Sequence, residues 1–152
     1  MSDPQYTLEF YRDRDGRQPV RDWLRDDLDR SKARALGVAM FHILQQEGVG
    51  VCATENGKPI SKGLFEFRLR HNAQEMLHNL GLLPPDEPRA QVGEHVLLRV
   101  YCHAYGNKVI LLLAGYDKGE APSKQREQRE IRTAEARLKD FQERMGRSTY
   151  ES

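Results

Sequence analysis

The segment from Val96 to Tyr116 constrains the fold most, because it predicts two strands joined by a tight turn. Val96–Tyr105 alternates small or apolar side chains with residues that have polar tips. Lys108–Tyr116 is apolar at its centre, and Gly106–Asn107 lies between the two runs. A short Gly-containing connection between two strand patterns indicates a β-hairpin, so we expect an antiparallel pair here.

Two further segments predict strands. Tyr6–Tyr11 is rich in aromatic and β-branched residues, which favour strands. Leu64–His71 alternates clearly, and successive side chains of a strand point to opposite faces. One face therefore carries Phe65, Phe67 and Leu69, and the other carries Glu66, Arg68 and Arg70.

Apolar residues recur at helical spacing in two other regions. Residues 19–47 predict two packed helices with Trp23 in their core, and Pro19 suits the first helical position. Asp29 or Ser31 is expected to cap the second helix, and Gly48 to end it. A charged helix over about 124–144 has one narrow apolar stripe, formed by Ile131, Ala134, Leu138, Phe141 and Met145.

The predicted order is therefore β, α, α, β, β, β, α, which indicates an α+β fold. We expect a small antiparallel sheet with an N-terminal helical pair and a C-terminal helix, in a single domain over residues 1–146. Residues 48–61 are expected to form a loop, and 147–152 a disordered tail. The insert at 72–95 allows a short amphipathic helix, with Ala73, Met76, Leu77 and Leu80, followed by a rigid polar loop. Helices on one face would leave the other face of the sheet open, with the polar strand residues on it.

Composition limits the classes of protein that fit. The chain has 152 residues with a formal net charge of +1, so any nucleic-acid site must be a local patch. No apolar run approaches the roughly 18 residues of a membrane span, and the first residues lack the apolar core of a secretory signal. We therefore expect a cytoplasmic protein with reduced thiols at Cys52 and Cys102.

The expected open face gathers cations. It would carry Arg68, Arg70, Arg99, Tyr101 and His103, with Lys58, Lys62, Lys118 and Lys124 at its rim. Arginine and lysine bind phosphate, and aromatic rings stack on unpaired bases, so this face predicts an RNA site. RNA cleavage by the 2′-OH needs charge stabilisation and proton transfer but no metal, and we find no acidic ligand set for one.

Each candidate also has a purely structural interpretation. Arg68 and Arg99 could pair with Glu66 or with the C-terminal helix. His103 could be a half-buried histidine with its hydrogen bonds satisfied, and Tyr101 could serve in packing. The loop lysines and the charged final helix could simply be solvated.

Three segments resemble the Gp49-like proteins, a branch of the HigB group within the RelE/ParE toxin superfamily. They are GKPISKGLFEFRLR, VLLRVYCHAYGNKVILLLAGYDK and PSKQREQREIRTAEARLKDF. The shared pattern is a G-L-aromatic-E-hydrophobic-R strand, a second strand with an arginine, an apolar strand that ends near lysines, and a last helix. The matching positions are Gly63–Arg68, Arg99, Gly106–Leu113, Lys118, Lys124, Glu130–Ile131 and Arg137–Phe141.

The resemblance implies a toxin of a type II toxin–antitoxin system. Such proteins cleave mRNA on the ribosome without a metal or cofactor, and a helix-turn-helix antitoxin silences them. It assigns Arg68 and Arg99 to phosphate and transition-state contacts, Lys58 and Lys62 to RNA binding, and Lys118 and Lys124 to the basic segment after the last strand.

Two main hypotheses follow. The first is a ribosome-dependent mRNA endoribonuclease with Arg68, Arg99, His103 and Lys118 as catalytic residues; it needs Arg68 and Arg99 side by side on an uncovered face. The second is a catalytically inactive protein of the same fold that binds a protein partner, such as an antitoxin or a gyrase-like target. A structural phage component is a third, weaker interpretation.

Overall fold

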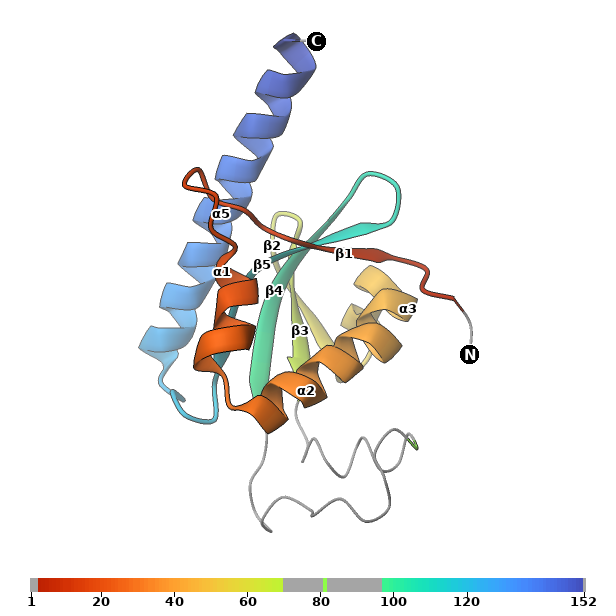
Figure 1. Ribbon diagram of the computed structural model, residues 1–152, viewed down its shortest axis with the longest axis vertical. Helices are drawn as coiled ribbons and strands as arrows, with labels where there is room; N and C mark the ends of the chain where they lie inside the picture. The colour runs from red at the N-terminus through yellow and green to blue at the C-terminus, as the bar shows by residue number, and fades with distance from the viewer. Residues whose placement is uncertain (1–2, 70–80, 82–96, 152) are drawn as a thin grey trace.

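A five-stranded mixed sheet forms the centre of the molecule (Figure 1). The computed structural model describes residues 3–69, 81 and 97–151. The strand order is β1-β5-β4-β3-β2. The strands are β1 (Thr7–Phe10), β2 (Gly57–Ser61), β3 (Leu64–Leu69), β4 (Leu98–Tyr105) and β5 (Val109–Asp117). With N-terminal helices and a long C-terminal helix around this sheet, the predicted α+β class is confirmed.

The predicted all-antiparallel sheet is wrong in one respect. The neighbouring pairs among β2, β3, β4 and β5 are antiparallel, but β1 pairs with β5 in parallel, with Thr7 opposite Val109 and Phe10 opposite Leu112. A parallel partner is reached only by a long crossover. No local sequence signal in β1 says which strand that partner is.

Strand β2 was missed, because Gly57 and Pro59 lie in a segment that reads as a loop. Proline lacks the N–H that a central strand must donate, and it is tolerated at a sheet edge. Among the described strands, β2 lies at the edge of the sheet and pairs only with β3. The turn between them needs Gly63, whose φ of 77° lies in the left-handed region.

The N-terminal helical segments cover one face of the sheet (Figure 1). They run as α1 (Pro19–Asp22), the π-helical η1 (Trp23–Asp27), α2 (Arg30–Ala39), the π-helical η2 (Met40–Leu44), α3 (Gln45–Glu47) and the 3-10 turn η3 (Gly48–Ala53). Of the two caps predicted for α2, Asp29 is the one observed, and it accepts hydrogen bonds from the backbone N–H groups of Ser31 and Lys32. Gly48 ends α3 with a φ of 55°, and a side chain there would collide with the ring of Tyr6.

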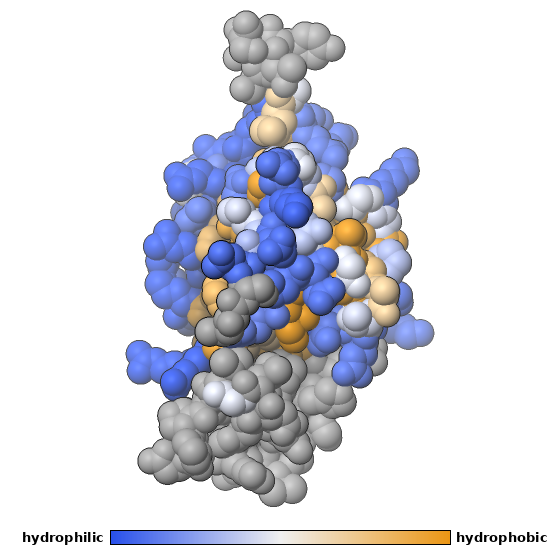
Figure 2. Space-filling model, turned by 90° about the vertical axis from the view of Figure 1, so that its right-hand side faces the viewer, coloured by the Kyte–Doolittle hydropathy of each residue, from blue (hydrophilic) through white to orange (hydrophobic). Residues whose placement is uncertain are grey.

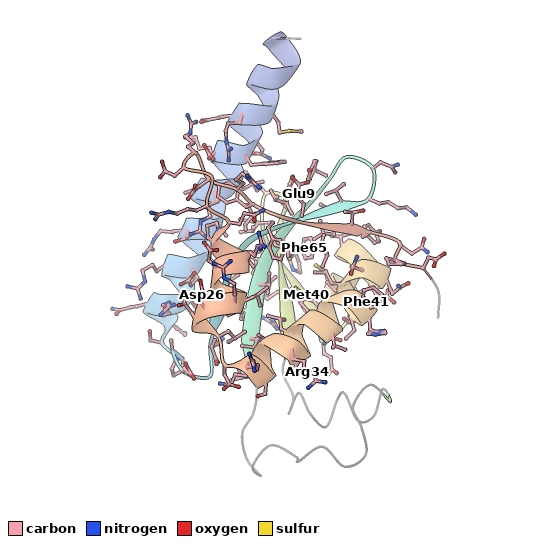
Figure 3. All side chains as sticks on the ribbon, viewed as in Figure 1. Glu9, Asp26, Arg34, Met40, Phe41 and Phe65 are labelled. Atoms are coloured by element: carbon pink, nitrogen blue, oxygen red, sulfur yellow. The ribbon has the colours of Figure 1, made fainter. Side chains whose placement is uncertain are left out.

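The first core lies between these helices and the sheet. Met40 is buried on the side facing β3, where Phe65 is also buried, whereas the next residue, Phe41, is 41% exposed (Figure 3). Trp23 packs against the same core. On the side of the molecule that carries β1 and α3, hydrophobic residues reach the surface in patches among hydrophilic ones (Figure 2).

A second core lies on the opposite face of the sheet, under α5 (Lys124–Glu151). Buried Ala134 and Leu138 of α5 pack on this face, and Ile131 and Phe141 pack beside them. The predicted stripe is therefore a core contact, except at Met145, which is exposed. The expected open face does not exist as such, because α5 covers much of it.

Helix α5 is longer than predicted, and hydrogen bonds to Asp140 hold it against the rest of the molecule. It continues as helix to Glu151, into the segment expected to be a disordered tail. The Asp140 carboxylate accepts hydrogen bonds from the Tyr11 hydroxyl at 2.6 Å, from Arg14 at 2.8 Å and from Arg144 at 2.7 Å. These bonds, first that of Tyr11, lower the pKa of Asp140 to about 2.

The described residues contain neither a disulfide bond nor a helix that could span a membrane. Both cysteines are free thiols, with Cys102 buried and Cys52 half-buried. None of the helices in residues 3–69 and 97–151 combines the length and apolar character needed to cross a bilayer.

Gly115 makes room for Trp23. A Cβ at this position would lie 2.5 Å from Cζ3 of the indole. We expect Gly115→Ala to lower the free energy of unfolding by about 1–3 kcal/mol, since the ring or the strand must shift. Gly37→Ala is the matched control, because a Cβ added at this exposed position of α2 would meet nothing within 4 Å, and it should stabilise by about 0.5–1 kcal/mol. Urea denaturation measures both; equal effects would contradict the packing described.

The Asp140 network predicts a pH-dependent stability. Its folded-state pKa of about 2 lies below the ordinary value of about 3.9, so its contribution is present above pH ~4 and is lost as the pH falls toward 2. Asp140→Asn should therefore cost about 1–2 kcal/mol at neutral pH and less at pH ~3. Urea denaturation at both pH values tests this, with Glu143→Gln as an exposed control on the same helix. A cost that is the same at both pH values would argue against the network.

Candidate functional site

The strand registers bring the polar residues of β2, β3 and β4 together on the α5 side of the sheet. In one row, Lys58 lies opposite Glu66, which lies opposite Tyr101. In the next row, Arg68 lies opposite Arg99, which lies opposite Tyr116. The prediction that Arg68 and Arg99 are neighbours is therefore confirmed.

A fully buried carboxylate holds the two arginines. Glu66 has no exposed surface, and its Oε1 lies 2.9 Å from Nε of Arg68 and 2.7 Å from Nε of Arg99. Arg99 also donates from Nη1 to the Leu98 carbonyl at 3.2 Å. A buried charge is tolerated only when it is paired, and this carboxylate meets two guanidinium groups. The structural interpretation of these arginines, pairing with Glu66, is what the geometry bears out.

Aromatic rings and α5 close this part of the face. Tyr101 is buried, its ring is parallel to that of Tyr116 at 6.5 Å, and the guanidinium of Arg126 lies over the Tyr116 ring at 5.4 Å. Burial, with a further contribution from the charge of Glu66, raises the pKa of the Tyr101 hydroxyl. We call Glu66, Arg68, Arg99, Tyr101 and Tyr116 the Glu66 cluster.

The prediction that Arg99 and Tyr101 face solvent is wrong, and Arg68 retains only 14% exposure of its side chain. The physical reason is that the narrow stripe of α5 needs an apolar surface, and Leu111 and Leu113 on the same face supply it. Arg70 lies outside the described residues. The face is an interior polar cluster rather than an open platform.

His103 lies apart from the Glu66 cluster and is half-exposed. It is four residues beyond Arg99 on the same face of β4, or about 13 Å along the strand. Its Nδ1 lies 2.8 Å from the carbonyl oxygen of Gly63. A carbonyl oxygen can only accept, so Nδ1 carries the hydrogen and Nε2 is left as the basic nitrogen of the neutral ring.

The surroundings of His103 are polar and aromatic. Its ring is parallel to that of Tyr105 at 6.3 Å, and the hydroxyl of Tyr105 donates to Glu9. Burial, assisted by that hydrogen bond, raises the pKa of Tyr105 to about 12. Exposed Lys62 directly precedes Gly63 in the β2–β3 turn. We call Lys62, His103, Tyr105 and Glu9 the His103 site.

The remaining predicted residues lie at separate places. Lys58 is exposed on the edge strand, beside the Glu66 cluster. Lys118 is 27% exposed, and its Nζ lies 3.7 Å from a carboxylate oxygen of Glu127 on α5. Lys124 is the exposed first residue of α5. The eight candidates that the structure describes thus do not form one site, and the half-exposed imidazole of His103 is separate from Arg68 and Arg99.

Compared with protein-family models, with curated proteins and with solved structures, the chain gives no match. Within the described residues, no group of three or more His, Cys, Asp or Glu side chains is placed to hold a metal ion.

The Glu66 cluster yields a stability prediction. Glu66→Gln should lower the free energy of unfolding by about 3–5 kcal/mol, because two largely buried guanidinium groups lose their counter-charge. Glu120→Gln removes a carboxylate that is 75% exposed and pairs with Lys32, so it should cost less than about 1 kcal/mol. Chemical denaturation at pH 7 measures both. If Glu66→Gln is as mild as the control, the pairing is not what stabilises this face.

Proposed function

We propose that the chain is a toxin of the RelE/HigB type from a type II toxin–antitoxin pair, and that it cleaves RNA with His103 as the proton-transfer residue. The resemblance of three segments supports the family assignment. The β, α, α, β, β, β, α order expected from the apolar patterns recurs among the described elements, with one added edge strand. The observation that carries the chemical part is the orientation of His103, whose Nδ1 is held by Gly63.

The chemistry needs few groups. The ribose 2′-OH loses its proton and attacks the adjacent phosphorus, the bond to the 5′-oxygen breaks, and the leaving 5′-oxygen takes a proton from water. The products are a 2′,3′-cyclic phosphate and a 5′-OH. The basic Nε2 of His103 can take the 2′-OH proton, since the hydrogen bond from Nδ1 fixes both the tautomer and the ring. The ammonium of Lys62, next to Gly63 in an exposed turn, can stabilise the charge on the phosphate oxygens.

The strand arginines have a different role in this proposal. Arg68 and Arg99 are not carried forward as phosphate ligands, because both are committed to Glu66 and Arg99 is buried. They tie β3 to β4, and β3 begins directly after Gly63 while His103 is on β4. The Glu66 cluster therefore supports the strand pair that holds His103 in place.

The burial of the arginines also favours a second candidate function. A member of the fold whose cationic face is closed could act without cleaving RNA, by binding a protein such as an antitoxin or a gyrase-like target. Arg99 at 4% exposure is the specific observation in its favour. In either case we expect a helix-turn-helix antitoxin as a partner, and in the first case mRNA on the ribosome as the substrate.

Induced expression separates the two candidates. The wild type should arrest growth and leave mRNA fragments that end in a 2′,3′-cyclic phosphate. His103→Gln should lower cleavage in a translation extract by about 10²–10⁴-fold, because the ring supplies the proton transfer. His42→Gln is the matched control, since His42 is a half-buried histidine on η2, away from β4, and it should cleave like the wild type.

Two outcomes count against the proposal. Full activity of His103→Gln would show that His103 is not the proton-transfer residue. Wild-type expression without growth arrest or RNA fragments, but with a protein that co-purifies in stoichiometric amounts, would select the binding function instead.

A further inference from the structure

The outward side of the first turns of α5 carries charge of a single sign. Lys124, Gln125, Gln128, Arg129 and Arg132 are all exposed. On a helix with 3.6 residues per turn, the last four of them lie on the side opposite the buried Ala134. We call these five residues the basic ridge.

The acidic residues of the same turns are turned away from this side. Glu127 lies toward Lys118 at 3.7 Å, and Glu130 accepts from Nε of Arg126 at 2.8 Å. Both carboxylates are less than a quarter exposed. Among the described residues, Lys124, Arg129 and Arg132 take part in no ion pair. The ridge thus offers three unneutralised cations and no acid.

The ridge surrounds an open hollow, and the next turns of α5 differ. The described part of the wall of this hollow, of about 590 Å³, consists of the ridge together with Ser123 and Arg126. Beyond the ridge the exposed charged residues of α5 are Glu135, Lys139 and Glu143, which alternate in sign. The concentration of positive charge is therefore specific to the first part of the helix.

We propose that the basic ridge binds the sugar–phosphate backbone of RNA; the choice of RNA among polyanions rests on the proposed function. Arginine forks match phosphate oxygens, and glutamine amides can bond to phosphate or ribose. An acidic protein fits less well, since the ridge has no apolar side chain to form the core of a protein interface. Arg129 and Arg132 are about 4.5 Å apart along the helix axis, so they can serve one strand together.

The ridge connects to the His103 site along α5. Phe141 of α5 contacts the ring of Tyr105 at 4.9 Å, and Glu135 accepts a hydrogen bond from Ser61 in the strand before Lys62. Arg132 and Phe141 are nine residues apart, or about 14 Å along the helix. Because the ridge faces outward and Phe141 faces the sheet, an RNA strand that contacts both the ridge and His103 must also pass around α5, whose diameter is about 10 Å.

Binding is tested with a fluorescent 2′-O-methyl oligouridylate of about twelve nucleotides, which lacks the attacking hydroxyl and cannot be cleaved. Fluorescence anisotropy at several salt concentrations gives the affinity and its salt dependence. Arg129→Ala with Arg132→Ala should weaken binding at least tenfold and reduce the slope of log K against log salt by about 1.4. Arg30→Ala with Arg34→Ala removes two exposed charges on α2, away from α5, and should change affinity less than about twofold.

Several results would overturn the ridge assignment. The assignment is wrong if the wild type binds no RNA, if the ridge variant binds as tightly as the wild type, or if the control variant loses as much affinity as the ridge variant. A polyglutamate peptide that displaces the RNA at a lower concentration than unlabelled RNA does would also overturn it. Failure of the proposed function is detected by a different measurement, RNA cleavage by the wild type. If the ridge binds RNA as expected but the wild type cleaves none, the ridge stands and the nuclease proposal does not.

Discussion

The pairing of the buried Glu66 carboxylate with the guanidinium groups of Arg68 and Arg99 is the interaction on which the α5 side of this molecule depends. A carboxylate with no exposed surface is stable only if opposite charge reaches it. The two arginines come from adjacent strands, so the pair fixes the register of β3 against β4. It also lets a helix cover a face that would otherwise present three charges to an apolar stripe.

The sequence predicted local structure well. The apolar periodicity located four of the five strands and both helical regions, and Asp29 and Gly48 act as the cap and the stop that their chemistry indicates. What could not be predicted is long-range. The parallel contact of β1 with β5 joins residues about one hundred positions apart. Strand β2 was missed because it contains Pro59, whose missing N–H is tolerated only at a sheet edge.

For the candidate site, too, the sequence predicted the local arrangement but not the long-range packing. Strand alternation correctly placed Arg68, Arg99, Tyr101 and His103 on one face, but alternation does not tell which face a distant helix will cover. That decision followed from Leu111 and Leu113, which give α5 an apolar surface beside the polar residues. The basic ridge had a usable signal, because Gln125, Gln128, Arg129 and Arg132 recur at helical spacing opposite the apolar stripe.

Burial thus separates the arginines that build the fold from those that can meet RNA. The most direct test of this division is modification of the native protein with phenylglyoxal, followed by mass spectrometry of each arginine. Arg99 should react on the order of 100-fold more slowly than Arg129 and Arg132, because it reacts only when the structure opens, and the rates should converge in urea. If Arg99 reacts as fast as Arg129 in the native protein, the face under α5 is open and the division between buried and RNA-binding arginines is wrong.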